Sequence, residues 1–137
     1  ATKWQTDRTF DALLLDAPCS GTGTLRRHPD IAWLKGEDDV DRLTVTQDRL
    51  LVRATELLKP GGILIYAVCS LQDDEGPARL DALLARDKRL ARVPVQQAEL
   101  PGLEAAITND GDVRTLPSMW PERGGLDGFF IGRVIRQ

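Results

Sequence analysis

The chain has 137 residues, of which 42% are hydrophobic and 28% charged, and this length and composition indicate one globular domain rather than a disordered chain. No apolar run is long enough to cross a bilayer, and residues 1–9 lack the apolar centre of a signal peptide, so we expect a cytoplasmic protein. The formal net charge of −3 argues against a protein that holds nucleic acid by overall charge, so any RNA contacts are expected to be local or made by other polypeptide.

The first predicted element is a buried strand, formed by the apolar run from Phe10 to Ala17 and ended by Pro18. A loop with two glycines follows. Helical periodicity then begins at about Asp38 or Asp39, either of which can serve as the N-cap, and continues to the stop signal at residues 59–62.

The second half of the chain starts with another apolar run, Ile63 to Val68, which is typical of a strand buried on both faces of a parallel sheet. The next helix is expected to begin at residues 73–75, with Pro77 in its first turn. Three segments complete the chain: a weaker strand from Val93 to Gln97, a region that is mostly loop from Pro101 to Gly125, and a closing strand from Phe129 to Ile135.

This order of strands and helices predicts an α/β sheet with helices on its faces. The first strand begins within ten residues of the start and has no partner before it. We therefore interpret the chain as a fragment, one half of an open sheet.

Two cysteines follow the ends of the two strongest predicted strands. Cys19 lies three residues after Asp16, and Cys69 directly follows Val68. Ligands bind at the carboxyl ends of strands in open α/β sheets, and a right-handed crossover between neighbouring strands would bring both thiols to this edge, at a strand spacing of roughly 5 Å. A disulfide is the alternative for the pair, although it is disfavoured in the cytosol, and a small buried hydrophobic residue is the alternative for Cys69.

Asp16 is a candidate functional residue because a carboxylate at the end of an apolar run is costly unless it is solvated, hydrogen-bonded or used. The alternative is a cap on the turn from Ser20 to Gly23. This turn contains Gly-Thr-Gly, which is only a weak phosphate-loop signal because the rest of a dinucleotide fingerprint is absent.

Arg26, Arg27 and His28 form a basic cluster in the same loop, which either contacts RNA phosphate or is a solvated surface. Trp33 and Trp120 either stack on a base or pack within the protein. His28 is the only histidine and no Cys-x-x-Cys spacing occurs, so we expect no metal site.

Three groups of residues occur in a fixed order along the chain: Asp16 to Gly23 continued by Arg27 to Asp30; Leu58 to Gly62 followed by Tyr66 to Leu71; and Arg114 to Pro117 followed by Gly125 and Asp127 to Phe130. Together they resemble the fourth motif, the sixth motif and the C-terminal signature of the Sun-type rRNA cytosine-C5 methyltransferases of the Nop/Sun group. The resemblance covers nearly the whole chain, from Phe10 to the end.

The resemblance implies that residues 1–137 are the C-terminal half of a Rossmann-like methyltransferase domain that depends on S-adenosyl-L-methionine (SAM). This fold has a mostly parallel sheet with an antiparallel last strand and helices on both faces. The glycine-rich half that binds SAM is absent from the sequence, so the chain alone is expected to bind SAM poorly and to be inactive. The oligomeric state stays open.

The resemblance also implies roles for particular residues. Cys69 would be the nucleophile that adds to C6 of cytosine, and Cys19 the partner that helps to eliminate the enzyme afterwards. Asp16 would hydrogen-bond the cytosine edge and favour protonation at N3. The expected contacts are Asp16, Ala17 and Pro18 for SAM, and Arg26, Arg27, His28 and Ser70 for the RNA. Small-subunit rRNA is the expected substrate, with the target base unpaired or flipped.

Two departures from the family pattern occur: Val68 stands where Thr is usual, and Glu75-Gly76 where Glu-Asn is usual. Two alternatives stay open, a methyltransferase that uses Cys19 as its nucleophile and a non-catalytic RNA-binding relic. An amino-group methyltransferase is disfavoured, because that class carries Asn/Asp-Pro-Pro-aromatic where this chain has Asp-Ala-Pro-Cys.

Overall fold

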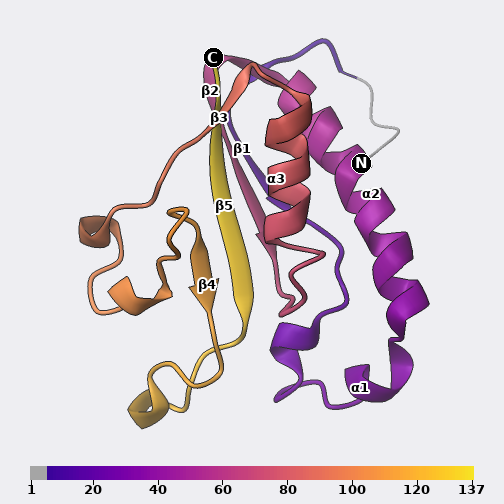
Figure 1. Ribbon diagram of the computed structural model, residues 1–137, viewed down its shortest axis with the longest axis vertical. Helices are drawn as coiled ribbons and strands as arrows, with labels where there is room; N and C mark the ends of the chain where they lie inside the picture. The colour runs from indigo at the N-terminus through magenta and orange to yellow at the C-terminus, as the bar shows by residue number, and fades with distance from the viewer. Residues whose placement is uncertain (1–5) are drawn as a thin grey trace.

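The structure is a computed structural model that describes residues 6–137. Residues 1–5, which belong to the segment examined above for a signal peptide, lie outside the described residues. In chain order the helices and strands are β1 (Phe10–Asp16), α1 (Ile31–Leu34), α2 (Glu37–Glu56), β2 (Leu58–Val68), α3 (Pro77–Arg86), β3 (Leu90–Arg92), β4 (Val113–Thr115) and β5 (Phe129–Arg136), with single 3₁₀ turns between some of them (Figure 1). In the part of the chain that the structure describes, no helix is long and apolar enough to span a membrane.

The strands form one mixed sheet in the order β1-β2-β5-β3, with β4 also paired to β5. The pairing of β1 with β2 is parallel, and β2, β3 and β4 all run antiparallel to β5. The expected α/β sheet with an antiparallel last strand is therefore confirmed. The parallel part of the sheet consists of β1 and β2 within residues 6–137.

Helix α2 connects β1 to β2 and begins one or two residues earlier than the sequence predicts. Its first turn holds Glu37, Asp38 and Asp39, whose negative charges are favourable at the positive end of the helix dipole. The Asp39 carboxylate also accepts a hydrogen bond of 3.1 Å from the Gly36 N–H, so Asp39 lies inside the helix and Gly36 is the cap.

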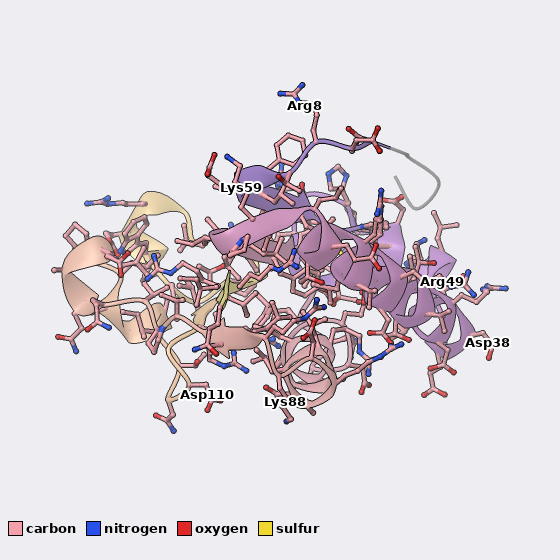
Figure 2. All side chains as sticks on the ribbon, turned by 90° about the horizontal axis from the view of Figure 1, so that it is seen from above. Arg8, Asp38, Arg49, Lys59, Lys88 and Asp110 are labelled. Carbon is pink, nitrogen blue, oxygen red and sulfur yellow. The ribbon has the colours of Figure 1, made fainter. Side chains whose placement is uncertain are left out.

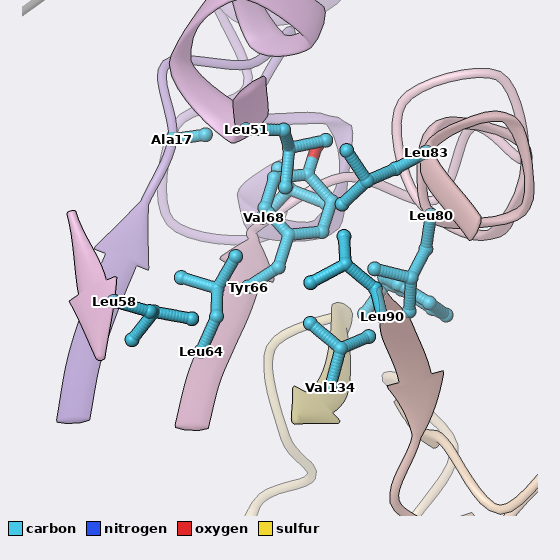
Figure 3. Close-up of a cluster of buried hydrophobic side chains, with 11 residues drawn as sticks. Ala17, Leu51, Leu58, Leu64, Tyr66, Val68, Leu80, Leu83, Leu90 and Val134 are labelled. Carbon is cyan, nitrogen blue, oxygen red and sulfur yellow. The ribbon is translucent and has the colours of Figure 1, made fainter. Parts of the chain in front are cut away.

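The core lies between the sheet and the two long helices, which cover the same face (Figure 3). Side chains alternate along a strand, so Leu64, Tyr66 and Val68 of β2 all point towards α2 and α3 and are fully buried. Leu14 and Ile65 point the other way and are 71% and 37% exposed. Helices were expected on both faces of the sheet, but within the described residues the long helices lie on one.

One predicted strand was misplaced. Strand β3 covers Leu90–Arg92 rather than Val93 to Gln97. The Val93 N–H still donates to the Arg133 carbonyl at 2.8 Å, but the next residue is Pro94, which has no N–H to continue the ladder. The Val95 N–H donates instead to the Gly111 carbonyl.

Charged side chains of both signs lie around the outside of the molecule. Figure 2 labels six of them, which point away from the body in different directions: Arg8, Asp38, Arg49, Lys59, Lys88 and Asp110. This mixture agrees with the formal net charge of −3.

Candidate active site

The parallel pairing of β1 with β2 brings the two cysteines together. Asp16 at the end of β1 lies opposite Ala67, and the Ala17 N–H donates to the Ala67 carbonyl at 2.9 Å. The loops that leave these strand ends place Cys19 Sγ 3.4 Å from Cys69 Sγ. Both thiols are free and half-buried, so the arrangement is a dithiol and not a disulfide.

The environment of Cys19 keeps its thiol protonated at neutral pH. Burial raises the pKa of the Cys19 thiol to about 12, and the hydrogen bond with Cys69 and the negative charge of Glu75 act in the same direction. A protonated Cys19 can donate its S–H to Cys69 across the 3.4 Å gap.

A buried carboxylate joins the two cysteine loops. Glu75 is 0% exposed, and it accepts hydrogen bonds from the Ser20 N–H at 2.8 Å, the Ser20 hydroxyl at 2.5 Å and the Ser70 hydroxyl at 2.6 Å. Gln47 of α2 donates to the same carboxylate at 3.1 Å and to the Pro18 carbonyl at 2.9 Å. Each serine directly follows a cysteine in the sequence.

This role of Glu75 was not predicted from the sequence, because residues 73–75 were expected to form the start of a helix. Helix α3 begins at Pro77, and Glu75 lies in the preceding turn, where Tyr66 donates its hydroxyl to the Glu75 carbonyl at 2.6 Å. The repeated Cys-Ser dipeptide was the signal that could have indicated a shared partner.

The glycine-containing loop after Cys19 connects the three segments that resemble the family motifs. The Gly23 N–H donates to the Cys69 carbonyl at 3.0 Å, and the Gly128 N–H donates to the Gly23 carbonyl at 2.8 Å. Thr22 Oγ1 accepts the Leu71 N–H at 2.9 Å. Because these groups already have partners within the protein, they are not available to bind a phosphate.

The predicted RNA-binding arginines contact the C-terminal loop. The Arg27 guanidinium forms an ion pair with Asp127, and Arg26 donates to the Gly124 carbonyl. His28 is exposed, and Ser70 is fully buried on the carboxylate. The structure therefore gives both arginines a partner within the protein, although both remain at the surface.

The residues predicted to contact SAM line the end of β1. Asp16 and Pro18 are exposed, whereas Ala17 is buried. The Asp16 carboxylate makes no hydrogen bond or ion pair with residues 6–137, so it does not cap the turn that follows it. It is free to accept a hydrogen bond from a ligand.

The two candidate stacking tryptophans differ in environment. Trp33 of α1 is 89% exposed. Trp120 donates its indole N–H to the Gly102 carbonyl at 2.8 Å and lies 4.8 Å below the Arg123 guanidinium, so it packs within the protein.

A cavity of about 510 Å³ lies between the α1–α2 junction and the cysteine loops. Its lining includes Ser20, Thr22, Lys35, Gly36, Gln72 and Asp74. This volume is in the range of small-molecule sites. No group of three or more His, Cys, Asp or Glu side chains that could hold a metal ion occurs among residues 6–137.

Comparison with known proteins gives one consistent result. A family model described as "16S rRNA methyltransferase RsmB/F" matches residues 1–135. The ribosomal RNA small subunit methyltransferase B of Klebsiella pneumoniae is 39% identical over 135 residues, and that of Shewanella oneidensis is 38% identical over 135 residues. These matches cover 98% and 97% of this chain, but the chain spans 28% of the length of each relative.

Solved structures show the same likeness. A crystal structure of a methyltransferase homolog protein from Pyrococcus horikoshii superposes with a TM-score of 0.70 at 27% identity, over 96% of this chain and 40% of that one. NSun6 from Pyrococcus horikoshii with SFG also gives a TM-score of 0.70, over 96% of this chain and 31% of that one. At 20% identity, the second likeness concerns the fold alone.

Proposed function

Because this chain belongs to the 16S rRNA methyltransferase RsmB/F family, we propose that it is part of an enzyme that transfers the methyl group of SAM to C5 of a cytosine in small-subunit rRNA. The observation that carries this proposal is the pair of thiols 3.4 Å apart at the carboxyl ends of two neighbouring parallel strands. Curated relatives that are 38% and 39% identical are named for small-subunit rRNA methylation, and this supports the substrate class.

C5 of cytosine is a weak nucleophile, so the reaction needs a nucleophile of the enzyme that first adds to C6 and thereby activates C5. The Cys69 thiolate adds to C6 and forms an S–C bond, and the electron pair of the C5=C6 bond is released towards C5. C5 then takes the methyl group, and the bond from that methyl to the sulfonium sulfur of SAM breaks. Loss of the C5 proton and cleavage of the S–C6 bond restore the double bond and free Cys69.

The raised pKa of the Cys19 thiol supports this division of roles. Cys19, whose pKa is raised to about 12, is protonated at neutral pH and is therefore a poor nucleophile. As an S–H donor 3.4 Å from Cys69, it can hydrogen-bond the sulfur that leaves C6 when the enzyme is eliminated. The raised pKa of Cys19 thus supports its proposed role as the hydrogen-bond donor and not as the attacking sulfur.

The end of β1 supports the proposed contacts with both substrates. SAM supplies an electrophilic methyl group when it is bound. Asp16, exposed and without a partner among residues 6–137, can accept a hydrogen bond from the cytosine edge and favour protonation at N3. Ala17 and Pro18, in the same turn, are the proposed neighbours of SAM.

The RNA is proposed to reach the thiols with the target base out of its stack, because C6 is inaccessible to a thiolate inside a helix. Arg26, Arg27 and His28 lie at the surface in the loop after Cys19, where they can contact phosphates next to the target. Ser70 is proposed to orient Cys69 near the base and not to contact phosphate, because its hydroxyl is fully buried on Glu75.

The test uses the protein extended upstream to the length of its curated relatives, incubated with SAM and small-subunit rRNA. Cys69→Ala is expected to give neither methyl transfer nor a denaturant-stable protein–RNA band. Cys19→Ala is expected to accumulate that band, because elimination is impaired. Methylation by Cys69→Ala with a dead Cys19→Ala would make Cys19 the nucleophile. Absence of both products from every variant and from the parent would favour an RNA-binding relic.

A further inference from the structure

The Glu75 carboxylate makes the same kind of contact with both cysteine loops. Ser20, next to Cys19, donates its N–H to Oε1 and its hydroxyl to Oε2, and Ser70, next to Cys69, donates its hydroxyl to the same Oε2 atom. The two serine oxygens are 3.2 Å apart as a result. One carboxyl group therefore fixes the residue beside each thiol.

The partners of Glu75 are all neutral. Its four donors come from Ser20, Ser70 and Gln47, and no Lys or Arg of residues 6–137 forms an ion pair with it. A fully buried carboxylate without a cation is costly unless its oxygens accept several hydrogen bonds. Holding two loops together is a reason for the fold to accept that cost, since a neutral side chain of this length offers fewer acceptor sites.

The other links between the two loops are weaker or lie further from the sulfurs. The S–H···S contact is a poor hydrogen bond and cannot fix a distance. The Gly23 N–H···Cys69 carbonyl bond ties the loop four residues after Cys19. Glu75 acts one residue from each sulfur, so its contacts have the most direct control of the 3.4 Å separation.

We propose that Glu75 is a positioning residue for the methyl transfer: through Ser20 and Ser70 it holds Cys19 and Cys69 at the separation that adduct formation and elimination require. This inference rests on the proposed function. Glu75 touches neither substrate, and its effect is exerted through the serines.

The experiment compares Glu75→Ala, Glu75→Gln and Ser70→Ala with the parent, in the protein extended to the length of its relatives. Circular dichroism melts establish the folded fraction at the assay temperature. A control, Glu122→Ala, removes an exposed glutamate outside the site. Two readouts follow: kcat and KM for methyl transfer per folded molecule, and the rate at which diamide joins Cys19 and Cys69 into a disulfide, the reagent taking up the two hydrogens.

Glu75→Ala is expected to lower kcat about 100-fold, the order of loss for a misplacement of about 1 Å, with little change in KM for either substrate. It is also expected to slow disulfide formation. Glu75→Gln is expected to recover about tenfold of the kcat loss, because its amide oxygen still accepts from Ser20 and its amide NH₂ can donate to the serine hydroxyls. Ser70→Ala is expected to lower kcat about tenfold, as the hydrogen bond that links Ser70 to Glu75 is lost.

Glu75→Ala with parental kcat per folded molecule and parental disulfide formation would overturn the proposal. If Glu75→Ala does not fold, Ser70→Ala and Glu75→Gln decide: parental kcat and disulfide rates in both would also overturn it. The disulfide readout needs neither SAM nor RNA. Slow disulfide formation in Glu75→Ala, with no methyl transfer by any of the proteins, would therefore refute the proposed function. It would still support the role of Glu75 in holding the two cysteines at their separation.

Discussion

The two cysteine loops are held more tightly by the protein than the α1 segment, residues 26–36, which follows the Cys19 loop. Around Cys19 and Cys69, a buried carboxylate, two serines and a glycine–glycine backbone contact hold the loops in place. In the α1 segment, His28 and Trp33 point into solvent. The residues proposed for bond making are therefore preorganised, whereas His28 and Trp33 stay open to a partner.

One glycine in each region tests this difference directly, with the largest expected effect. A Cβ on Gly23 would lie 1.9 Å from the Gly128 carbonyl oxygen, whereas a Cβ on Gly36 would meet nothing within 4 Å. We expect Gly23→Ala to destabilise the protein by about 1–3 kcal/mol or more through overpacking, and to abolish methyl transfer. Gly36→Ala meets no steric clash and is expected to cost no more than about 1 kcal/mol, the effect of a poorer N-cap residue on α2. Urea unfolding measures both, and equal effects would contradict the comparison.

The Cys19 thiol is expected to react slowly with iodoacetamide at neutral pH. The pKa of Cys19 is raised to about 12, so its thiolate is scarce below that pH and increases as the pH rises towards it. In the protein with both cysteines, alkylation of Cys19 is expected to be slow at pH 8 and to keep rising above pH 10. Peptide mass spectrometry across the pH range provides the measurement. A plateau near pH 9, the value of an ordinary thiol, would refute the assigned environment.

Trp33 and Trp120 provide the next contrast. Trp33→Ala is expected to weaken RNA binding by about 1–3 kcal/mol, the range for one stacked base, and to leave the melting temperature nearly unchanged. Trp120→Ala is expected to do the reverse, because its ring packs against Arg123 and its N–H holds the Gly102 carbonyl. Filter binding together with thermal melts distinguishes the two. RNA affinity that is the same in Trp33→Ala as in the parent would remove α1 from the interface.

Arg27→Ala is expected to have only a small effect on stability. Its side chain is 63% exposed, so loss of the ion pair with Asp127 is expected to cost about 0.2–1 kcal/mol. If Arg27 also contacts phosphate, Arg27→Ala lowers the slope of log affinity against log salt by about 1. RNA titrations at several salt concentrations measure that slope. An unchanged slope would show that Arg27 does not contact phosphate and only pairs with Asp127.

The strand ends and the thiol pair could be predicted from the sequence because apolar runs and crossover handedness are general rules. The burial of Glu75 could not, because its partners Ser20 and Gln47 are 55 and 28 residues away. The pairing of Arg27 with Asp127, 100 residues apart, was hidden for the same reason. Likewise, a buried strand such as β2 indicates that both faces are apolar without indicating which face the helices of this chain cover.

The central claim is that Cys69, and not Cys19, bonds to the target cytosine. It is tested most directly by trapping the adduct on an rRNA fragment that carries 5-fluorocytosine at the target, where the C5 fluorine prevents the proton loss needed for elimination. Digestion and mass spectrometry then identify the cysteine that carries the nucleotide. If Cys69 is the nucleophile, the nucleotide is expected on the peptide containing Cys69, with Cys19 unmodified. A nucleotide on Cys19 would contradict it.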